Sequence, residues 1–192
     1  MTRIIGGQAG SLRLSSAASV TRPTSDRVRE ALFSRLEANL DLEGAIVFDL
    51  FAGTGALGLE AASRGARGVW MVDNHRGAIE VIQGNIAKVT AALSSPPQLV
   101  ASKSSVNAFL SRTIDQVVDV VFIDPPYDFP AGEVDEIINA LAPWLATDAW
   151  VLLERSSRSP EPLWPKEFRA LPTKNYGDTT VYVASYQSTE AS

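Results

Sequence analysis

Three glycines, Gly53, Gly55 and Gly58, form a G-x-G-x-x-G pattern between an apolar run and a helical stretch. Glycines at this spacing permit a tight turn and let a ligand approach the backbone beside the positive N-terminus of a helix. Asp73 follows Gly53 by about 20 residues, where the end of the next predicted strand can place a carboxylate on both hydroxyls of a ribose. The pattern predicts a nucleoside-binding site, although a tight strand–helix turn without a ligand uses the same glycines.

A carboxylate and a short proline motif add to the glycine pattern. Asp49 is expected inside the first turn, four residues before Gly53, where a negative charge suits the cationic amino acid end of S-adenosylmethionine and repels the pyrophosphate of NAD. The run Asp124-Pro125-Pro126-Tyr127 follows directly after the fourth predicted strand. Because ligands of an open α/β sheet lie at the carboxyl ends of its strands, we expect this run to face the same crevice as the glycine turn.

The Asp-Pro-Pro-Tyr run offers two acceptors and an aromatic face to one small group. Its prolines fix the backbone and donate no N–H, which leaves the carbonyl of Pro125 free to accept. That carbonyl and the Asp124 carboxylate fit the two N–H groups of an exocyclic amine, whose lone pair can then face an electrophilic methyl group. Tyr127 can stack on the base that carries the amine. The run therefore predicts an amino methyltransferase, whereas a rigid loop is the simpler explanation of the two prolines.

Composition excludes several other chemistries. The chain has 192 residues with no cysteine and one histidine, His75. Disulfides, thiolate nucleophiles, cysteine zinc sites and iron–sulfur clusters are therefore excluded, and we expect no metal site. No apolar run approaches the ~20 residues of a membrane helix, and the first residues lack the apolar region of a signal peptide. These features predict a cytoplasmic protein without membrane contact.

Positive charge is concentrated near the start of a chain that is acidic as a whole. The net charge is −5 and the sequence pI is about 4.9. The first 36 residues nevertheless carry six arginines against two acidic residues. This asymmetry predicts a basic arm on an acidic body, although arginines on a solvated helix face would give the same count.

Short apolar runs alternate with amphipathic stretches along most of the chain, as strands alternate with helices in α/β proteins. The predicted strands cover residues 45–50, 68–72, 98–101, 117–123 and 149–153, and a closing hairpin covers 168–171 and 179–186. The alternation predicts a Rossmann-like α/β fold with a mostly parallel sheet, helices on both faces and a C-terminal antiparallel β-hairpin.

Three segments follow from this pattern. We expect a short basic N-terminal arm or hairpin over residues 1–24 and one catalytic domain over 25–187. The last residues, 188–192, are expected to form a disordered tail. Residues 155–166 predict a proline-rich loop to which the sequence assigns no role.

Several longer segments are typical of one enzyme family. They are RIIGG at 3–7, TRPTSDRVREALFSRL at 21–36, FDLFAGTGALGLEAASRGA at 48–66, FIDPPY at 122–127 and YGDTTVYV at 176–183. Together they cover nearly the whole chain, which resembles the RsmD-type ribosomal RNA guanine-N2 methyltransferases of the class I S-adenosylmethionine-dependent group. Many amino methyltransferases share the Asp-Pro-Pro-Tyr motif, but the Arg-Pro-Thr and Tyr-Gly-Asp-Thr blocks are much narrower.

The resemblance implies methylation of the exocyclic N2 amine of a specific guanine in 16S ribosomal RNA, with S-adenosylmethionine as cofactor. The implied partner is that RNA within an assembled or assembling small ribosomal subunit. Residues 124–127 would hold the target amine and base. The cofactor-binding candidates are Asp49, Gly53, Gly55, Asp73, its neighbour Asn74, and Ser105, where the family usually has Asp or Asn near the adenine.

The arginines near the start are the candidates for RNA contact. The chain has Gly10-Ser11-Leu12-Arg13 where the family commonly has an Arg-Gly-Arg-like stretch, so two positive charges are missing. This departure predicts that RNA contacts shift toward the first helix. The RNA-binding candidates are Arg3, Arg13, Arg22, Arg27 and Arg29.

Alternative functions keep part of this pattern. An amino methyltransferase could act on another RNA, on DNA or on a protein glutamine, but 192 residues leave no room for a DNA-recognition region. The glutamine enzymes carry Asn in place of Asp124 and a helical N-terminal domain. An NAD-dependent oxidoreductase or a non-catalytic nucleotide-binding module would use the glycine turn and leave Asp124–Tyr127 without a role. Titration with S-adenosylmethionine against NAD separates these classes.

Overall fold

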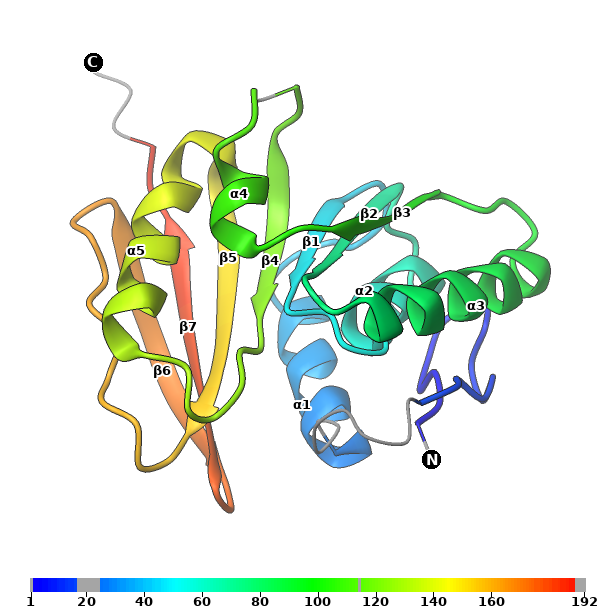
Figure 1. Cartoon of the computed structure of the whole chain (residues 1–192), viewed down its shortest axis with the longest axis horizontal. Helices are drawn as coiled ribbons and strands as arrows, with labels where there is room; N and C mark the ends of the chain where they lie inside the picture. The colour runs from blue at the N-terminus through cyan, green and yellow to red at the C-terminus, as the bar shows by residue number, and fades with distance from the viewer. Residues whose placement is uncertain (1, 17–24, 114, 189–192) are drawn as a thin grey trace.

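The structure is a computed structural model that describes residues 2–16, 25–113 and 115–188. In this part of the chain the strands are β1 (Ile46–Leu50), β2 (Gly68–Asp73), β3 (Gln98–Lys103), β4 (Val118–Ile123), β5 (Leu145–Ser156), β6 (Phe168–Tyr176) and β7 (Thr179–Tyr186). They form one sheet in the order β3-β2-β1-β4-β5-β7-β6 (Figure 1). The first five strands in this order are parallel, whereas β7 is antiparallel to both β5 and β6. The predicted mostly parallel sheet with an antiparallel C-terminal hairpin is confirmed.

Helices cover both faces of the sheet. They are α1 (Asp26–Glu37), α2 (Ala56–Ser63), α3 (Arg76–Ala92), α4 (Val106–Leu110), α5 (Ala131–Leu141) and the short 3-10 helix η1 (Ala142–Trp144). Buried side chains of α1, α2 and α3 form one core with the sheet, and those of α4, α5 and η1 form the other. This two-sided cover explains why the strands are nearly continuous apolar runs rather than alternating ones.

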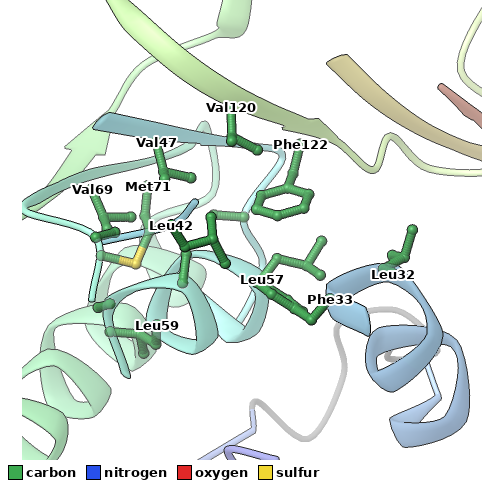
Figure 2. Close-up of a cluster of buried hydrophobic side chains, with 14 of the residues drawn as sticks. Leu32, Phe33, Leu42, Val47, Leu57, Leu59, Val69, Met71, Val120 and Phe122 are labelled. Atoms are coloured by element: carbon green, nitrogen blue, oxygen red, sulfur yellow. The ribbon is translucent and has the colours of Figure 1, made fainter. Parts of the chain in front are cut away.

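Strand β1 shows how one strand supplies both cores. Its five residues are all buried. Val47 packs with Phe33, Leu57 and Met71 on the side of α1 and α2, where Figure 2 shows these side chains converging. Phe48 lies on the other side, among the residues of the second core. Because β1 is central and immobilised on both faces, the loop that follows it starts from a rigid base.

The N-terminal hairpin, residues 2–16, packs against this domain and is not a detached arm. Leu14 donates its N–H to the carbonyl of Thr2 at 2.9 Å, and Arg3 and Arg13 form an antiparallel bridge. Ile4 and Leu14 are fully buried in the same core as α1. Figure 1 shows the hairpin next to α1 and below α3. Residues 2–16 therefore form a hairpin held against the domain, and the rest of the expected arm, residues 17–24, lies outside the described part.

Three elements differ from the sequence prediction. Strand β5 extends to Leu145–Ser156, so the loop predicted at 155–166 begins only after Ser156, and β6 continues beyond residue 171 to cover Phe168–Tyr176. Helix α4 was not expected, because its five residues are too few to show a helical repeat. The expected tail at 188–192 falls outside the described residues except for Ser188. No helix in the described part is long and apolar enough to cross a membrane.

Candidate cofactor and amine site

The glycine turn joins β1 to α2 and has a left-handed backbone at three positions, of which Phe51, with φ of +62°, is the one that is not glycine. Gly53 has φ of +56° and Gly55 has φ of +75°, values that favour glycine. A Cβ atom at Gly55 would lie 2.9 Å from Met71 Sδ, and one at Gly58 would lie 2.8 Å from Val69 Cγ1. At Gly53 the nearest atom, the carbonyl oxygen of Phe51, is 4.0 Å away. Gly55 and Gly58 therefore permit close packing, and Gly53 alone faces open space that a ligand can enter.

Asp73 ends β2 beside this turn and is buried, with 8% of its surface exposed. Its Oδ2 accepts the N–H of Gly53 at 2.9 Å, and its Oδ1 accepts the N–H of His75 at 2.8 Å. The carboxylate thus fixes the turn while each oxygen keeps a lone pair that can accept another hydrogen bond. Asn74, next in the chain, is exposed.

Asp49 lies inside β1, beneath the glycine turn, and not in the turn as the sequence suggested. Its carboxylate is 1% exposed, and Oδ2 accepts the N–H of Gly58 at 2.8 Å. Burial raises the pKa of Asp49 well above 3.8. The bond from Gly58 opposes this change, and the negative charges of Asp124 and Asp73 add to it. Three carboxylates from three strand ends therefore share one region.

The Asp-Pro-Pro-Tyr run begins where β4 ends, next to β1. The N–H of Asp124 donates to the carbonyl of Leu50 at 3.3 Å, which places the run beside the start of the glycine turn. Asp124 is half-buried, Pro125 is buried and Pro126 is exposed. Tyr127 is 52% exposed, so its side chain is partly accessible from solvent. Both loops therefore lie at the same edge of the sheet, and the shared crevice stays a prediction.

Two supports of this run were missed by the sequence analysis. The ring of Phe129 lies 4.9 Å from that of Phe51, and Arg155 Nη2 donates to the Phe129 carbonyl at 2.8 Å. The hydroxyl of Tyr127 lies 3.4 Å from Thr179 Oγ1, at the start of β7. Thr179 belongs to the Tyr-Gly-Asp-Thr block. In the sequence, only membership of the Tyr-Gly-Asp-Thr block indicated that Thr179 could lie near Tyr127.

The candidate RNA-binding arginines separate into two groups. Arg13 and Arg27 are exposed, and Arg3 is exposed with an ion pair of 3.4 Å to Asp26. Arg29 is fully buried, so the expectation that it contacts RNA is wrong: its Nη2 donates to Asp26 at 2.7 Å and to the Arg3 carbonyl at 2.8 Å. Arg22 lies outside the described residues.

Ser105 has a local structural role. It is the N-cap of α4, where its hydroxyl accepts the N–H of Ala108 at 3.2 Å. The residue is exposed after the end of β3, so an adenine contact stays a prediction. Within residues 2–16, 25–113 and 115–188, no group of three or more His, Cys, Asp or Glu is arranged to hold a metal ion.

Fold and site together define a class I methyltransferase-like domain, with a glycine turn after the first strand and an Asp-Pro-Pro-Tyr run after the fourth. Residues 2–185 match the family described as Conserved hypothetical protein 95, and the chain belongs to that family. It is 36% identical over 166 residues to Ribosomal RNA small subunit methyltransferase D of Escherichia coli K12, with 85% of this chain and 79% of the relative covered. The resemblance to RsmD-type ribosomal RNA methyltransferases is thereby confirmed.

Solved structures agree with this assignment. The Escherichia coli protein yhhF superposes with a TM-score of 0.82 at 31% identity, over 97% of this chain and 98% of that one. Magnesium protoporphyrin IX methyltransferase from Synechocystis, solved with bound S-adenosylmethionine, gives a TM-score of 0.65 at 16% identity over 84% and 79% of the two chains. The second likeness shows the shared fold.

Proposed function

We propose that this protein transfers a methyl group from S-adenosylmethionine to the exocyclic N2 amine of a guanine in small-subunit (16S) ribosomal RNA. The observation that carries the proposal is the position of Asp124, which is hydrogen-bonded through its N–H to the end of β1 and electrostatically coupled to Asp49. The name of the Escherichia coli relative supports ribosomal RNA of the small subunit as the substrate.

The residues at the strand ends fit the proposed cofactor. Open space beside Gly53 admits a ligand to the backbone, and the Asp73 carboxylate retains acceptor capacity for ribose hydroxyls. Asp49 lacks a cationic partner among the described residues and is suited to a positively charged group. Gly55 shapes the turn, and Asn74 and Ser105 complete the proposed set. S-adenosylmethionine would supply an electrophilic methyl group.

The Asp-Pro-Pro-Tyr run would bind and orient the amine. Asp124 accepts one N–H and the Pro125 carbonyl the other, so that the nitrogen lone pair faces the cofactor. Pro126 keeps the backbone rigid, and Tyr127 stacks on the guanine. Transfer of the methyl group would break its bond to the cofactor sulfur, which leaves as a neutral thioether, and would place the positive charge on the amine nitrogen. The Asp124 carboxylate would stabilise that charge and provide an acceptor for the proton that leaves.

RNA attraction would be local, because the protein is acidic as a whole. Arg3, Arg13 and Arg27 are the exposed described candidates. Each phosphate contact adds about −0.7 to the log–log salt slope for single-stranded RNA. We therefore expect Arg27→Gln to reduce the slope by about that amount for undermethylated small subunits. An unchanged slope in both Arg13→Gln and Arg27→Gln would remove this account of binding.

The variant Asp124→Ala tests the proposed reaction. Loss of one acceptor that acts more strongly in the transition state should lower the rate by about 10²–10³. The affinity for S-adenosylmethionine should stay within a few-fold, since Asp124 is assigned to the amine. The assay is mass spectrometry of methylguanine in undermethylated small subunits, with calorimetry for the cofactor and for NAD as a comparison.

Asp128→Ala is the matched control, because Asp128 is an exposed carboxylate on the same loop. It should leave the rate unchanged. Retention of most activity in Asp124→Ala, or an equal loss in Asp128→Ala, would contradict the assignment. Binding of NAD in place of S-adenosylmethionine would point to the oxidoreductase alternative.

A further inference from the structure

Asn85, on α3, connects the N-terminal hairpin to the glycine turn. Its side chain is fully buried. Its Oδ1 accepts the N–H of Ser15 at 2.8 Å, and its Nδ2 donates to the carbonyl of Ser15 at 3.0 Å. The same Nδ2 donates to the carbonyl of Thr54 at 2.9 Å. One amide group therefore bonds two segments that are far apart in the sequence.

The bond to Thr54 acts on the middle of the glycine turn. Thr54 stands between Gly53 and Gly55, and its carbonyl shares a peptide plane with the N–H of Gly55. That N–H donates to the carbonyl of Ala52 at 2.7 Å. Both polar groups of this peptide are thus held, and a peptide held at both ends cannot rotate freely. Its orientation sets the backbone next to Gly53, where the turn faces open space.

The hairpin has other anchors that do not reach the turn. Glu60 accepts the N–H of Ile5 at 2.6 Å and of Gly6 at 2.8 Å, and Ser63 Oγ accepts the N–H of Ala9 at 2.9 Å. These bonds join the hairpin to α2 alone. Docking of the hairpin therefore does not itself need the bond from Asn85 to Thr54, which indicates a second role for this amide.

We propose that Asn85 is a positioning residue that links docking of the N-terminal hairpin to the conformation of the glycine turn, and thereby to cofactor affinity. The proposal rests on the proposed function, since it takes the turn as the cofactor site. Because coupling between two sites is reciprocal, bound cofactor also stabilises the hairpin at Ser15. The N-terminal hairpin would then contribute to cofactor binding without touching the cofactor.

Two variants of Asn85 and one control test the link. Asn85→Ala removes all three bonds, whereas Asn85→Asp keeps an acceptor for the Ser15 N–H and loses the donor to the carbonyls of Thr54 and Ser15. We expect both to weaken S-adenosylmethionine binding at least tenfold by calorimetry and to raise its KM, with kcat at saturating cofactor within a few-fold. Lys88→Ala removes only the 2.8 Å bond from Lys88 Nζ to Ser15 Oγ, and its affinity should stay within twofold.

Hydrogen exchange in the unmodified protein tests the reciprocal effect and needs no variant. The Ser15 amide should exchange at least several-fold more slowly with saturating S-adenosylmethionine than without it. The same amide should respond to cofactor much less in Asn85→Asp. An unchanged Ser15 rate on cofactor binding overturns the link even if the Asn85 variants fail to fold.

Asp73→Ala separates failure of this inference from failure of the proposed site. If Asp73→Ala weakens cofactor binding while folded Asn85 variants bind normally, the link is wrong and the site stands. If neither Asp73→Ala nor the Asn85 variants change affinity, the cofactor lies elsewhere and both proposals fail. If Lys88→Ala weakens binding as much as Asn85→Asp does, general loosening of the hairpin explains the effect and the specific role of the Asn85–Thr54 bond is refuted.

Discussion

Glu60 and Asp49 are both buried carboxylates, with 0% and 1% of their surface exposed, but their surroundings are opposite. Glu60 accepts backbone N–H groups of the N-terminal hairpin and pairs with Arg64 at 2.8 Å and with Arg29 at 4.0 Å. Asp49 accepts the N–H of Gly58, and its charged neighbours are the carboxylates of Asp73 and Asp124.

The difference separates a structural charge from a charge placed for a ligand. A buried carboxylate that is paired and hydrogen-bonded holds its partners in place, and Glu60 connects the hairpin, α1 and α2 in this way. A buried carboxylate beside other carboxylates is costly to ionise, and such groups concentrate at functional sites. The proposed cofactor, with its cationic amino acid end, would offset the cost of ionising Asp49. Glu60 needs no ligand to offset its charge, because Arg64 and Arg29 already do so.

Removal of Glu60 should have the largest effect on stability. Glu60→Ala leaves the buried Arg29 with Asp26 as its remaining carboxylate, removes one of the two carboxylate partners of Arg64, and leaves two hairpin N–H groups without their acceptor. Breaking a buried ion pair by removing one partner costs about 3–5 kcal/mol. Urea unfolding followed by circular dichroism should show a loss of that size. A loss below about 1 kcal/mol, the range of an exposed pair, would mean that Glu60 does not stabilise the fold more than Asp49 does.

Asp49→Asn should change stability in the other direction. The amide retains an acceptor for the Gly58 N–H and removes a buried group that is costly to ionise, so the free energy of unfolding at neutral pH should rise. Cofactor affinity should fall, because a hydrogen bond to a charged group contributes about 1.5–3 kcal/mol, or roughly 10- to 100-fold in Kd. Calorimetry and urea unfolding measure both effects. A variant that is less stable and binds S-adenosylmethionine normally would show that Asp49 stabilises the fold and has no role in cofactor binding.

The local motifs at this site were predictable from sequence, and the difference between the two carboxylates was not. Gly53, Asp73 and the Asp124 run each follow directly after an apolar run, so strand order alone placed them at one edge of the sheet. Arg29 is buried because its side of α1 faces Glu60 on α2. The hydrophobic periodicity of α1 does not reveal this contact between the two helices. The bond from Asn85 to Ser15 joins residues 70 positions apart and has no local signal either.

The raised pKa of Asp49 predicts how cofactor affinity depends on pH. A positively charged ligand binds better to the ionised carboxylate, so affinity should fall as pH falls through the raised pKa. Because the folded protein holds this proton more tightly than the unfolded chain, the stability that Asp49 contributes decreases as pH rises from 3.8 through the raised pKa. Asp49→Asn should lack both dependences. Parallel titrations of the two proteins from pH 3.8 upward provide the measurement, and identical pH profiles would exclude Asp49 as the titrating group.

Arg64→Gln should have the smallest effect and tests whether Glu60 is held by more than one cation. Arg64 bonds to Glu60 at 2.8 Å and to Glu37 at 2.7 Å, with its side chain 12% exposed. Since Arg29 and two backbone N–H groups still face Glu60, we expect a loss of about 1 kcal/mol, well below that of Glu60→Ala. Arg76→Gln is the control, because the Arg76–Glu80 pair is exposed and contributes at most about 0.5 kcal/mol. Urea unfolding of both variants ranks them. A loss for Arg64→Gln as large as that for Glu60→Ala would show that Arg64 alone compensates the Glu60 charge and that the buried Arg29 does not share it.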